Sequence, residues 1–424
     1  RTYFRGTLYS IEQEKMGLVI QEMVGQQYGN RFYPHFAGVA QSYNFYPVGS
    51  QKAEQGIAQI ALGLGHYVVS GGSTLRFSPG CPEVLPQFPT AAHFVKGSQT
   101  DFLAIDLSHS ELDFLDDCES NLIRYGLDAA ERDGSLQPVG SVYLPQDDII
   151  RDGLNWPGPR VVTFSNILKW EALPLASALV DLLKLAQTGM GGDIEIELAV
   201  DMGDWGRTVL DGEPRKPALS VLQVRPMMLQ DYADASVETE SHPPERLLCR
   251  TDTAIGHGMI GDIRDVVYVT ATDLDGYSTP QIALDVAAIN ERLMDKKRPY
   301  LLVGPGRWGT FDSALGVPVK WGQIAGARVI VEIPFGDRSV DPSQGTHFFQ
   351  NVTSLRLGYL TLRGRAAKDR EFMDLKWLQA QPEFDQGTSV RHVRLARPLQ
   401  VHLDGRKGKA VILKPLEPEP DEAL

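Results

Sequence analysis

Apolar and acidic residues alternate in the segment DIEIELAV, which carries Glu195 and Glu197. Alternation with a period of two predicts a β-strand that buries its aliphatic face and turns both carboxylates to the other side. A second strand is predicted at 218–225, where the same period places Gln223 and Arg225 on one face. If the two strands pair antiparallel with their apolar faces together, these four side chains form one polar patch.

Other segments show the periods of helices and strands. Leucines spaced three and four residues apart predict a helix at 174–188, which the glycines from Gly189 onward end. A cap followed by a proline predicts a helix that starts at Thr279 and runs to Lys297. The remaining expectations are a helix at 54–62 and strands at 15–24, 38–43, 193–200, 266–269, 300–303, 328–332, 354–362 and 390–403.

Composition shifts divide the chain into two expected domains. Residues 230–245 combine five acidic residues with two adjacent prolines and no apolar period, which is typical of a linker. We therefore expect an α/β fold, with one lobe at 1–235 and a separate α+β domain at 246–415. The tail at 416–424 holds proline and acid with almost no core-forming residue, so we expect it to be disordered.

Charge and cysteine content exclude several function classes. The 424 residues include 41 Lys and Arg against 54 Asp and Glu, a formal net charge of −13, which argues against nucleic acid or an anionic membrane as a partner. The three cysteines are too few and too scattered for a disulfide framework or a zinc motif. With no signal sequence or membrane-spanning run, we expect a cytoplasmic protein. The chain opens at Arg1 within patterned sequence, so we also expect a segment upstream.

The polar patch has two interpretations. Two carboxylates two residues apart on a strand lie about 7 Å from each other and repel unless a cation or an arginine neutralises them. Mg²⁺ prefers carboxylate oxygens, and a guanidinium suits a phosphoryl oxygen, so the functional interpretation is a metal–nucleotide phosphate site. The alternative is a solvated sheet face with a cross-strand salt bridge worth less than about 1 kcal/mol.

A resemblance to a known family favours the functional interpretation. The segments GLVIQEMV (17–24), AGVAQS (37–42), GLGHYVVSG (63–71), IEIELA (194–199) and LQVRP (222–226) occur in this order. Together they resemble the ATP-grasp nucleotide-binding domain of the phosphoenolpyruvate synthase and pyruvate phosphate dikinase family, over residues 10–230. The resemblance implies that this part is the C-terminal lobe of an ATP-grasp domain, with a mixed or antiparallel sheet.

The resemblance also implies a role for each matching residue. Glu195 and Glu197 would be ligands of ATP-bound Mg²⁺, and Gln223 would contact the nucleotide. Arg225 would be the catalytic residue that contacts phosphate. The residues that would border the adenine, partly through backbone groups, are Gln21, Glu22, Met23 and Val24. The implied activity is ATP- and Mg²⁺-dependent transfer of a phosphoryl group to a small-molecule acceptor.

Other parts of the family pattern are missing from this sequence. The lobe with a phosphate-gripping lysine would lie upstream of Arg1, and neither the swivelling domain with its phosphohistidine motif nor the pyruvate-binding barrel is recognisable. The segment SQGTHFFQ is a faint echo of the phosphohistidine motif, which makes His347 a candidate phosphoryl acceptor. The alternative is an ordinary histidine that begins a helix or strand at 348–353.

The missing parts leave other functions open. One is a non-catalytic, nucleotide-responsive or scaffold protein that keeps the sheet without turnover. Another is a phosphotransferase of the same family that acts on a glycan or a small drug-like molecule. A further motif, GPGRWG from Gly304, matches G-x-G-x-x-G, but the residues after it lack a helical period, so the dinucleotide fingerprint is not met. An anion-binding turn that uses Arg307 stays open.

Overall fold

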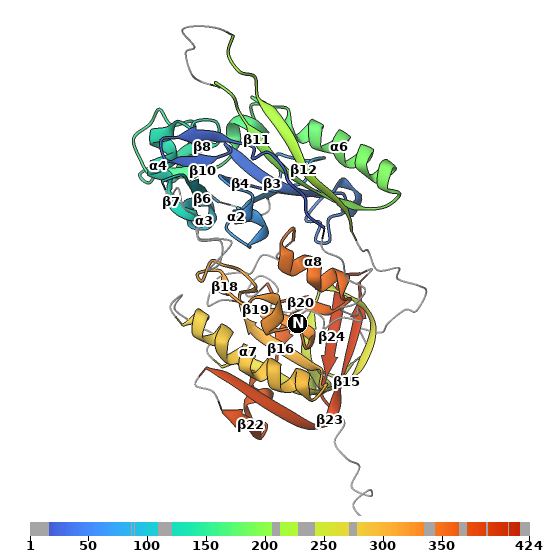
Figure 1. Cartoon of the computed structure of the whole chain (residues 1–424). Coiled ribbons are helices and arrows are strands. Elements are labelled where there is room, and N and C mark those ends of the chain that lie inside the picture. Colours follow the sequence, from blue (N-terminus) through green and yellow to red (C-terminus); the bar gives the residue numbers. More distant parts are fainter. Residues whose placement is uncertain are drawn as a thin grey trace, which may run out of the picture. The chain divides into compact units, whose positions relative to one another are not determined.

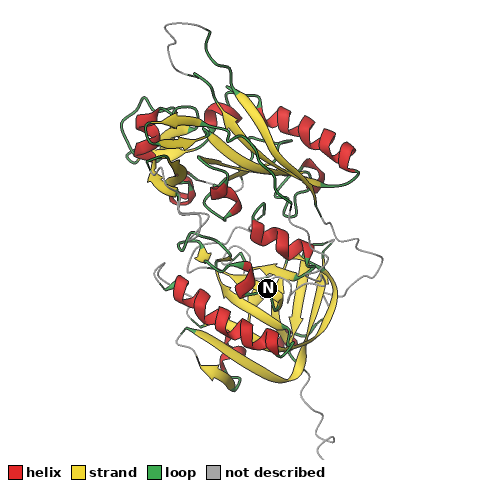
Figure 2. Ribbon diagram, viewed as in Figure 1, coloured by secondary structure: helices red, strands yellow, loops and turns green. Residues whose placement is uncertain are grey.

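The computed structural model describes residues 17–85, 87–88, 90–108, 121–205, 213–227, 242–270, 278–334, 344–363, 371–386, 389–405 and 407–415. The chain divides into two compact units, one of residues 19–227 and one of residues 228–424 together with the segment up to Leu18, whereas the sequence placed the boundary between 235 and 246. Both units combine helices and sheets, which confirms the general α/β class (Figures 1 and 2). Most of the expected linker, residues 230–241, and the tail expected to be disordered lie outside the described residues. No helix in the described part of the chain is both long and apolar enough to cross a bilayer.

In the first unit, residues 19–227, the described residues form three antiparallel sheets. The largest has the strand order β12-β11-β3-β4-β5. Its strands are β3 (Phe36–Gln41), β4 (Ile57–Leu62), β5 (Leu75–Phe77), β11 (Ile194–Asp201) and β12 (Ala218–Pro226). The second sheet consists of β1 (Gln26–Tyr28), β2 (Arg31–Tyr33), β6 (Asp101–Asp106) and β7 (Leu122–Gly126), and the third of β8 (Gly140–Leu144), β9 (Ile149–Asp152) and β10 (Arg160–Val162). The helices are η2 (Ala53–Gln55), α2 (His66–Val69), α3 (Ala91–Gly97), α4 (Leu127–Asp133), α5 (Ser165–Leu168) and α6 (Leu175–Met190).

Helix α6 covers the aliphatic side of the five-stranded sheet, where it packs against β11 and β3 (Figure 1). Leu175, Leu179 and Leu183, four residues apart, form its buried stripe. The helix ends at Gly191, whose φ of 73° is the left-handed conformation that glycine adopts without strain. The aliphatic residues of β11 are buried beneath this layer, so the acidic residues of β11 point to the other face of the sheet.

The second unit is built on a ten-stranded mixed sheet, with the order β14-β20-β19-β16-β15-β23-β24-β13-β21 and with β22 paired to β23. Its strands are β13 (Leu247–Thr251), β14 (Ala254–Ile255), β15 (His257–Val269), β16 (Tyr300–Pro305), β19 (Ala327–Ile333), β20 (Gly358–Thr361), β21 (Phe372–Met373), β22 (Glu383–Gln386), β23 (Val390–Asp404) and β24 (Lys409–Leu413). The unit also contains a short parallel pair, β17 (Arg307–Trp308) and β18 (Gly316–Val317). Its helices are η3 (Pro244–Arg246), α7 (Thr279–Asp295), η4 (Trp321–Gln323), α8 (His347–Ser354) and α9 (Leu375–Gln379).

Four neighbouring strands of this sheet, β15, β16, β19 and β20, run parallel. Helix α7 connects β15 to β16, and α8 connects β19 to β20, as crossovers between parallel strands require. The sequence pattern predicted an α+β domain here, whereas crossovers of this kind belong to α/β architecture. One face of the four strands, which includes Val303 and Val331, belongs to the main apolar core of the unit. The alternate positions face the other way.

Three local expectations were wrong. The predicted helix at 54–62 is instead the 3₁₀ turn η2 followed by β4, because all six residues of β4 are buried and leave no polar face to reveal the period. Of the strand predicted at 15–24, residues 17–24 form no strand, and residues 15 and 16 lie outside the described part. Ser354 ends α8, so only 358–361 of the strand predicted at 354–362 is extended.

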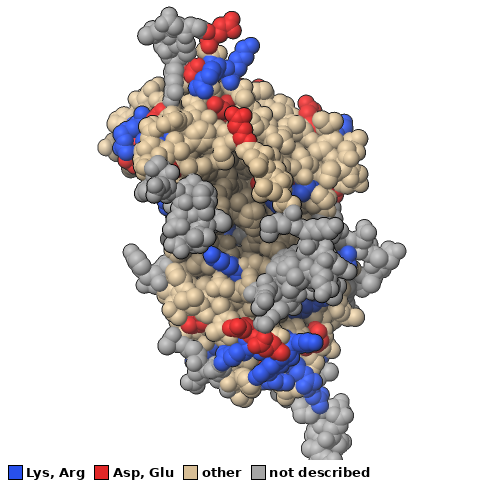
Figure 3. Space-filling view, viewed as in Figure 1, with Lys and Arg blue, Asp and Glu red and all other residues tan. Residues whose placement is uncertain are grey.

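Charged side chains of both signs lie next to one another on the face drawn in Figure 3. Such mixing is expected for a sequence in which 41 basic residues accompany 54 acidic ones. No uniformly acidic surface is seen among the described residues in that view.

Candidate functional site

The two strands that carry the predicted site residues, β11 and β12, pair antiparallel. Their register sets Glu195 opposite Arg225 and Glu197 opposite Gln223. Arg225 Nε donates to Glu195 Oε1 at 3.0 Å, and Arg225 Nη2 donates to Glu197 Oε1 at 2.6 Å. One guanidinium thus joins both carboxylates, and the alternation in the sequence placed these side chains on the same face, as expected.

Burial differs strongly among the three charged groups. The Glu195 residue is 2% exposed, whereas the side chains of Glu197 and Arg225 are 24% and 26% exposed. Burial of a carboxylate is costly unless a hydrogen-bonding or charged partner compensates it, and Arg225 supplies such a partner for Glu195. Because Arg225 and Glu197 remain partly accessible, a ligand that approaches this face meets them before it meets Glu195.

Sequence reasoning missed a fourth member of the site, Gln41. It lies opposite Glu195 on β3, and its Nε2 donates to Glu195 Oε2 at 2.6 Å. Gln41 is 2% exposed, and its Oε1 is buried with no hydrogen-bond partner among the described residues. The signal was present in the matching segment AGVAQS, where Gln41 is the polar residue that follows an apolar strand.

The donor set suits a hard cation that also binds phosphate oxygens. No group of three or more His, Cys, Asp or Glu residues in the described ranges is arranged to hold a metal by itself. Mg²⁺ is usually bound by one or two carboxylates together with substrate phosphates and water, rather than by a complete protein cage. Two carboxylates beside the unpartnered carbonyl oxygen of Gln41 fit that pattern.

A β-bulge separates the polar pairs from the rest of the β11–β12 ladder. The register shifts between Glu197 and Leu198, so that Leu198 lies opposite Val221 and Leu222 is the extra residue of β12. The carbonyl of Leu222 accepts a hydrogen bond from Gln21 Nε2 at 2.9 Å. This contact holds the segment before β1 at the outer edge of β12, directly beside Gln223.

The other residues predicted to border the adenine are less constrained. Glu22 and Met23 are exposed, Val24 is half-buried, and all three lie in the extended segment before β1 rather than in a strand. Gln223 is exposed on β12. His347 belongs to the second unit, where it is the exposed first residue of α8 after the Thr346 cap. His347 therefore begins a helix, as the alternative interpretation of the sequence expected. Its role as a phosphoryl acceptor stays a prediction.

Polar side chains continue across the same face of the sheet toward β5. Gln59 on β4 lies opposite Val39, the β3 neighbour of Glu197, and opposite Arg76 on β5. Thr74 Oγ1 donates to Gln59 Oε1 at 3.1 Å. Gln59 and Arg76 are no more than 9% exposed. The polar side chains on this part of the sheet face are therefore buried.

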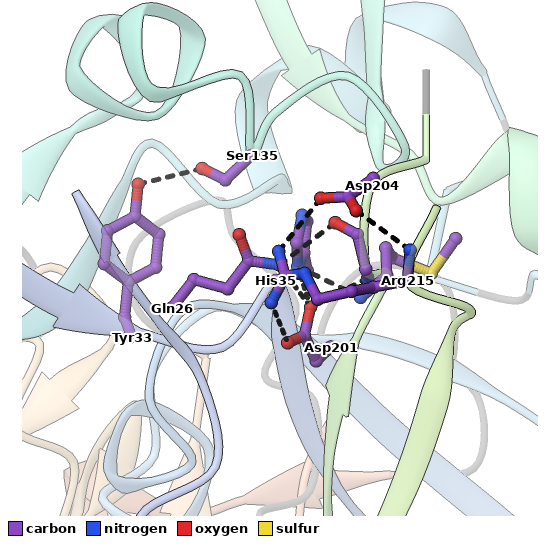
Figure 4. Close-up of polar contacts among 9 residues, drawn as sticks. Gln26, Tyr33, His35, Ser135, Asp201, Asp204 and Arg215 are labelled. Atoms are coloured by element: carbon purple, nitrogen blue, oxygen red, sulfur yellow. Dashed lines mark hydrogen bonds and ion pairs between the residues drawn. The ribbon is translucent and has the colours of Figure 1, made fainter. Parts of the chain in front are cut away.

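A second polar cluster lies at the other end of β11 (Figure 4). Asp201 accepts hydrogen bonds from the Gln26 side chain and from the Gly203 backbone, and its Oδ1 lies 3.3 Å from His35 Nδ1. Burial opposes ionisation of Asp201, but the contacts with His35 and Gln26 outweigh it and lower its pKa to about 2. Arg215 binds the neighbouring Asp204 through Nη2 at 3.0 Å and so anchors the end of the hairpin.

Comparison with protein-family models, with curated proteins and with solved structures finds no match for this chain.

Proposed function

We propose that this protein is an ATP- and Mg²⁺-dependent phosphotransferase with an ATP-grasp-like lobe similar to that of phosphoenolpyruvate synthase and pyruvate phosphate dikinase. The nucleotide phosphates lie on the face of β11 and β12 that carries Glu195, Glu197 and Arg225. The observation that supports it most is the double hydrogen bond of Arg225 to the two acids, because a guanidinium suits a phosphoryl oxygen and carboxylates suit Mg²⁺.

Glu197, Glu195 and the Oε1 atom of Gln41 are the groups that would hold the metal. A Mg²⁺ ion held there would supply positive charge against the β- and γ-phosphates. Glu197 is the more accessible carboxylate, so it makes the first contact, while the buried Glu195 fixes the position of Arg225. Gln41 orients Glu195 through its amide N–H.

Arg225 stabilises the charge that develops on the transferred phosphoryl group. Its bonds to the carboxylates use Nε and Nη2. The planar guanidinium can therefore present Nη1 to a phosphoryl oxygen while it stays anchored to Glu195, which a lysine cannot do. In this arrangement the acids hold the arginine in place before the substrate arrives.

The base of the nucleotide lies along the outer edge of β12. Gln21 is already fixed to the Leu222 carbonyl there, and Gln223 is exposed beside it. Residues 22–24 would then contact the adenine through backbone groups. His347, in the second unit, is the candidate phosphoryl acceptor.

Isothermal titration with Mg–ATP tests this proposal, with Arg225→Lys compared against Arg160→Lys. Arg160 is a matched control because it also bridges to an acid, Glu131, in the same unit, and its side chain is 24% exposed. Arg225→Lys should weaken Mg–ATP binding by about tenfold or more, since the fork geometry is lost. Arg160→Lys should bind as the parent does. Absence of binding to the parent, or equal binding by both variants, would contradict the proposal.

A second function, nucleotide binding without turnover, is supported by one observation. Arg225 already forms ion pairs with both acids within the protein itself, so the three side chains are held together without a ligand. A transfer assay with γ-labelled ATP separates the two functions. Consumption of the γ-phosphate that depends on Arg225 supports the phosphotransferase, and Mg–ATP binding without consumption supports a nucleotide-responsive protein.

A further inference from the structure

The second unit buries a carboxylate at the edge of its parallel strands. Glu332 is the last residue but one of β19, and it is fully buried. The register places it between Gly304 of β16 and Thr361 of β20, both at or next to the carboxyl ends of their strands. In α/β sheets this edge is where ligands bind, because the loops that leave the strands surround it.

Several polar atoms around Glu332 lack hydrogen bonds. Its Oε1 accepts from the backbone N–H of Trp308 at 3.0 Å. Its Oε2, the Thr361 hydroxyl and the indole Nε1 of Trp308 are all buried, and none makes a hydrogen bond of good geometry with the described residues. The hydroxyls of Tyr359 and Thr361 lie near enough to the carboxyl to lower its pKa, whereas the indole N–H has no such neighbour among the described residues. Unsatisfied buried groups are rare in folded proteins, and three at one place point to an occupant that supplies the missing partners.

Aromatic rings enclose this cluster. The indole of Trp308 lies directly over Gly304, where a Cβ atom would come within 2.3 Å of the ring. Tyr359, two residues before Thr361 on β20, contacts Phe348 of α8 with ring centroids 6.2 Å apart. Glycine at 304 is therefore required for the indole to reach its position beside Glu332.

We propose that the second unit has a ligand site of its own at Glu332, which binds a small polyhydroxylated molecule, such as a sugar or the ribose of a nucleoside, through adjacent hydroxyl groups. This site is separate from the phosphate site proposed for β11 and β12.

The mixture of donors and acceptors favours hydroxyl groups over ions. One ligand hydroxyl can donate to Glu332 Oε2 and accept from Trp308 Nε1. A second, adjacent hydroxyl can donate to the same carboxylate and accept from the Thr361 hydroxyl. The indole N–H disfavours a metal ion, and the carboxylate disfavours an anion. Aromatic rings such as those of Trp308 and Tyr359 pack well against the apolar C–H face of a sugar.

The raised pKa of Glu332 is consistent with a binding site in which the hydrogen-bond donors of a ligand are absent. Burial raises the pKa of Glu332 to about 7, and the nearby Tyr359 hydroxyl, the Trp308 N–H, the charge of Arg307 and the Thr361 hydroxyl offset only part of this effect. Hydrogen bonds donated by a ligand would favour the ionised form and lower this pKa again.

A bound water molecule offers the same hydroxyl chemistry, so the experiment must separate it from a ligand. We suggest isothermal titration of the full chain, without Mg²⁺, with D-ribose, D-glucose, adenosine and 2′,3′-dideoxyadenosine. The variants are Glu332→Gln and Thr361→Val, which keep the shape of each side chain, and Trp308→Phe, which removes the indole N–H together with part of the ring. Trp321→Phe is the matched control, since Trp321 packs against the same Phe348 with ring centroids 5.9 Å apart. Thr361→Val keeps the test decisive if Glu332→Gln does not fold.

Binding of at least one polyhydroxylated probe to the parent chain is expected, with adenosine bound about tenfold or more tightly than its dideoxy analogue. The site variants should lose that binding, whereas Trp321→Phe and Arg225→Lys should retain it. If no probe binds, or if Glu332→Gln and Thr361→Val bind like the parent, the occupant is water and the proposal is wrong. Loss of binding in Arg225→Lys alone would assign the ligand to the first unit and would equally overturn it. Because Arg225 is varied separately, either proposal can fail without the other.

Discussion

Arg225 on β12 and Glu195 on β11 lie directly opposite each other, with Arg225 Nε 3.0 Å from Glu195 Oε1. The glutamate is 2% exposed, whereas the arginine side chain is 26% exposed. The buried acid therefore depends on an arginine that remains within reach of a ligand. This relationship links the stability of the sheet to the chemistry proposed for its polar face.

Removal of the arginine should destabilise the first unit. Arg225→Ala removes the charged partner of the buried Glu195, and we expect a loss of about 2 kcal/mol in the free energy of unfolding. Urea denaturation of Arg225→Ala and of the double variant Arg225→Ala/Glu195→Gln measures the coupling. The double variant should recover part of the loss, because it carries no unpaired buried charge. Equal stability of the parent and Arg225→Ala would show that Glu195 does not need its partner.

The dependence of nucleotide binding on Mg²⁺ should change in Glu197→Gln. The amide removes a carboxylate that repels the phosphates in the absence of metal, so metal-free ATP should bind as well as or better than to the parent. Mg–ATP should bind more weakly, because one of the proposed metal ligands is lost. Titrations with and without Mg²⁺ measure both effects, and Glu131→Gln, at the other acid–arginine pair of the unit, is the control. If the ratio of the affinities for Mg–ATP and metal-free ATP is the same in Glu197→Gln as in the parent, Glu197 is not a ligand of the metal.

Asp201 should stabilise the protein above its unfolded pKa and lose this effect in acid. Its pKa falls from 3.8 in the unfolded chain to about 2 in the folded protein, so its contribution is present above pH 3.8 and disappears as the pH falls through 2. This shift corresponds to about 2 kcal/mol at neutral pH. Asp201→Asn should therefore be less stable than the parent at pH 7, and the gap should narrow steadily toward pH 2. Asp128→Asn, at an exposed ion pair with Arg132, is the control and should leave stability unchanged.

Glu332 should have the opposite pH dependence. Its pKa is raised from 4.5 to about 7, so the folded form holds a proton that the unfolded form releases. Stability of the second unit should decline as the pH rises from 4.5 through 7, by about 3 kcal/mol in total. Glu332→Gln should abolish this decline and become the more stable protein relative to the parent above pH 8. Parallel pH profiles of thermal unfolding for the two proteins would contradict the assignment.

The sequence was informative where one face of an element is polar. The alternation around Glu195 and Glu197 predicted both β11 and the face on which its acids lie, and the leucine spacing predicted α6. It failed where an element is buried on both faces, because the apolar run of β4 has the same composition as a buried helix. The segment before β1 shows the reverse error, since Leu18 and Ile20 look like strand residues but are 85% and 87% exposed.

The members of both sites that sequence reasoning missed are brought in by strand pairing. Gln41 reaches Glu195 through the β3–β11 register, across more than 150 residues of chain. Glu332 is a single acid in the apolar strand ARVIVEI, and nothing in that strand identifies Thr361 or Trp308 as its neighbours. Contacts of this kind depend on the order and register of strands in the sheet, which local periodicity does not contain.

Hydrogen–deuterium exchange of the full chain with and without Mg–ATP tests the central claim most directly, because it locates the nucleotide on the sequence. We expect Mg–ATP to slow exchange in peptides that cover 193–201 and 218–227, with the segment at 21–24 protected as well. Peptides from β8 and β9, on a separate sheet of the same unit, should exchange at the same rate in both states. Protection confined to other parts of the chain, or none at saturating Mg–ATP, would contradict the nucleotide site.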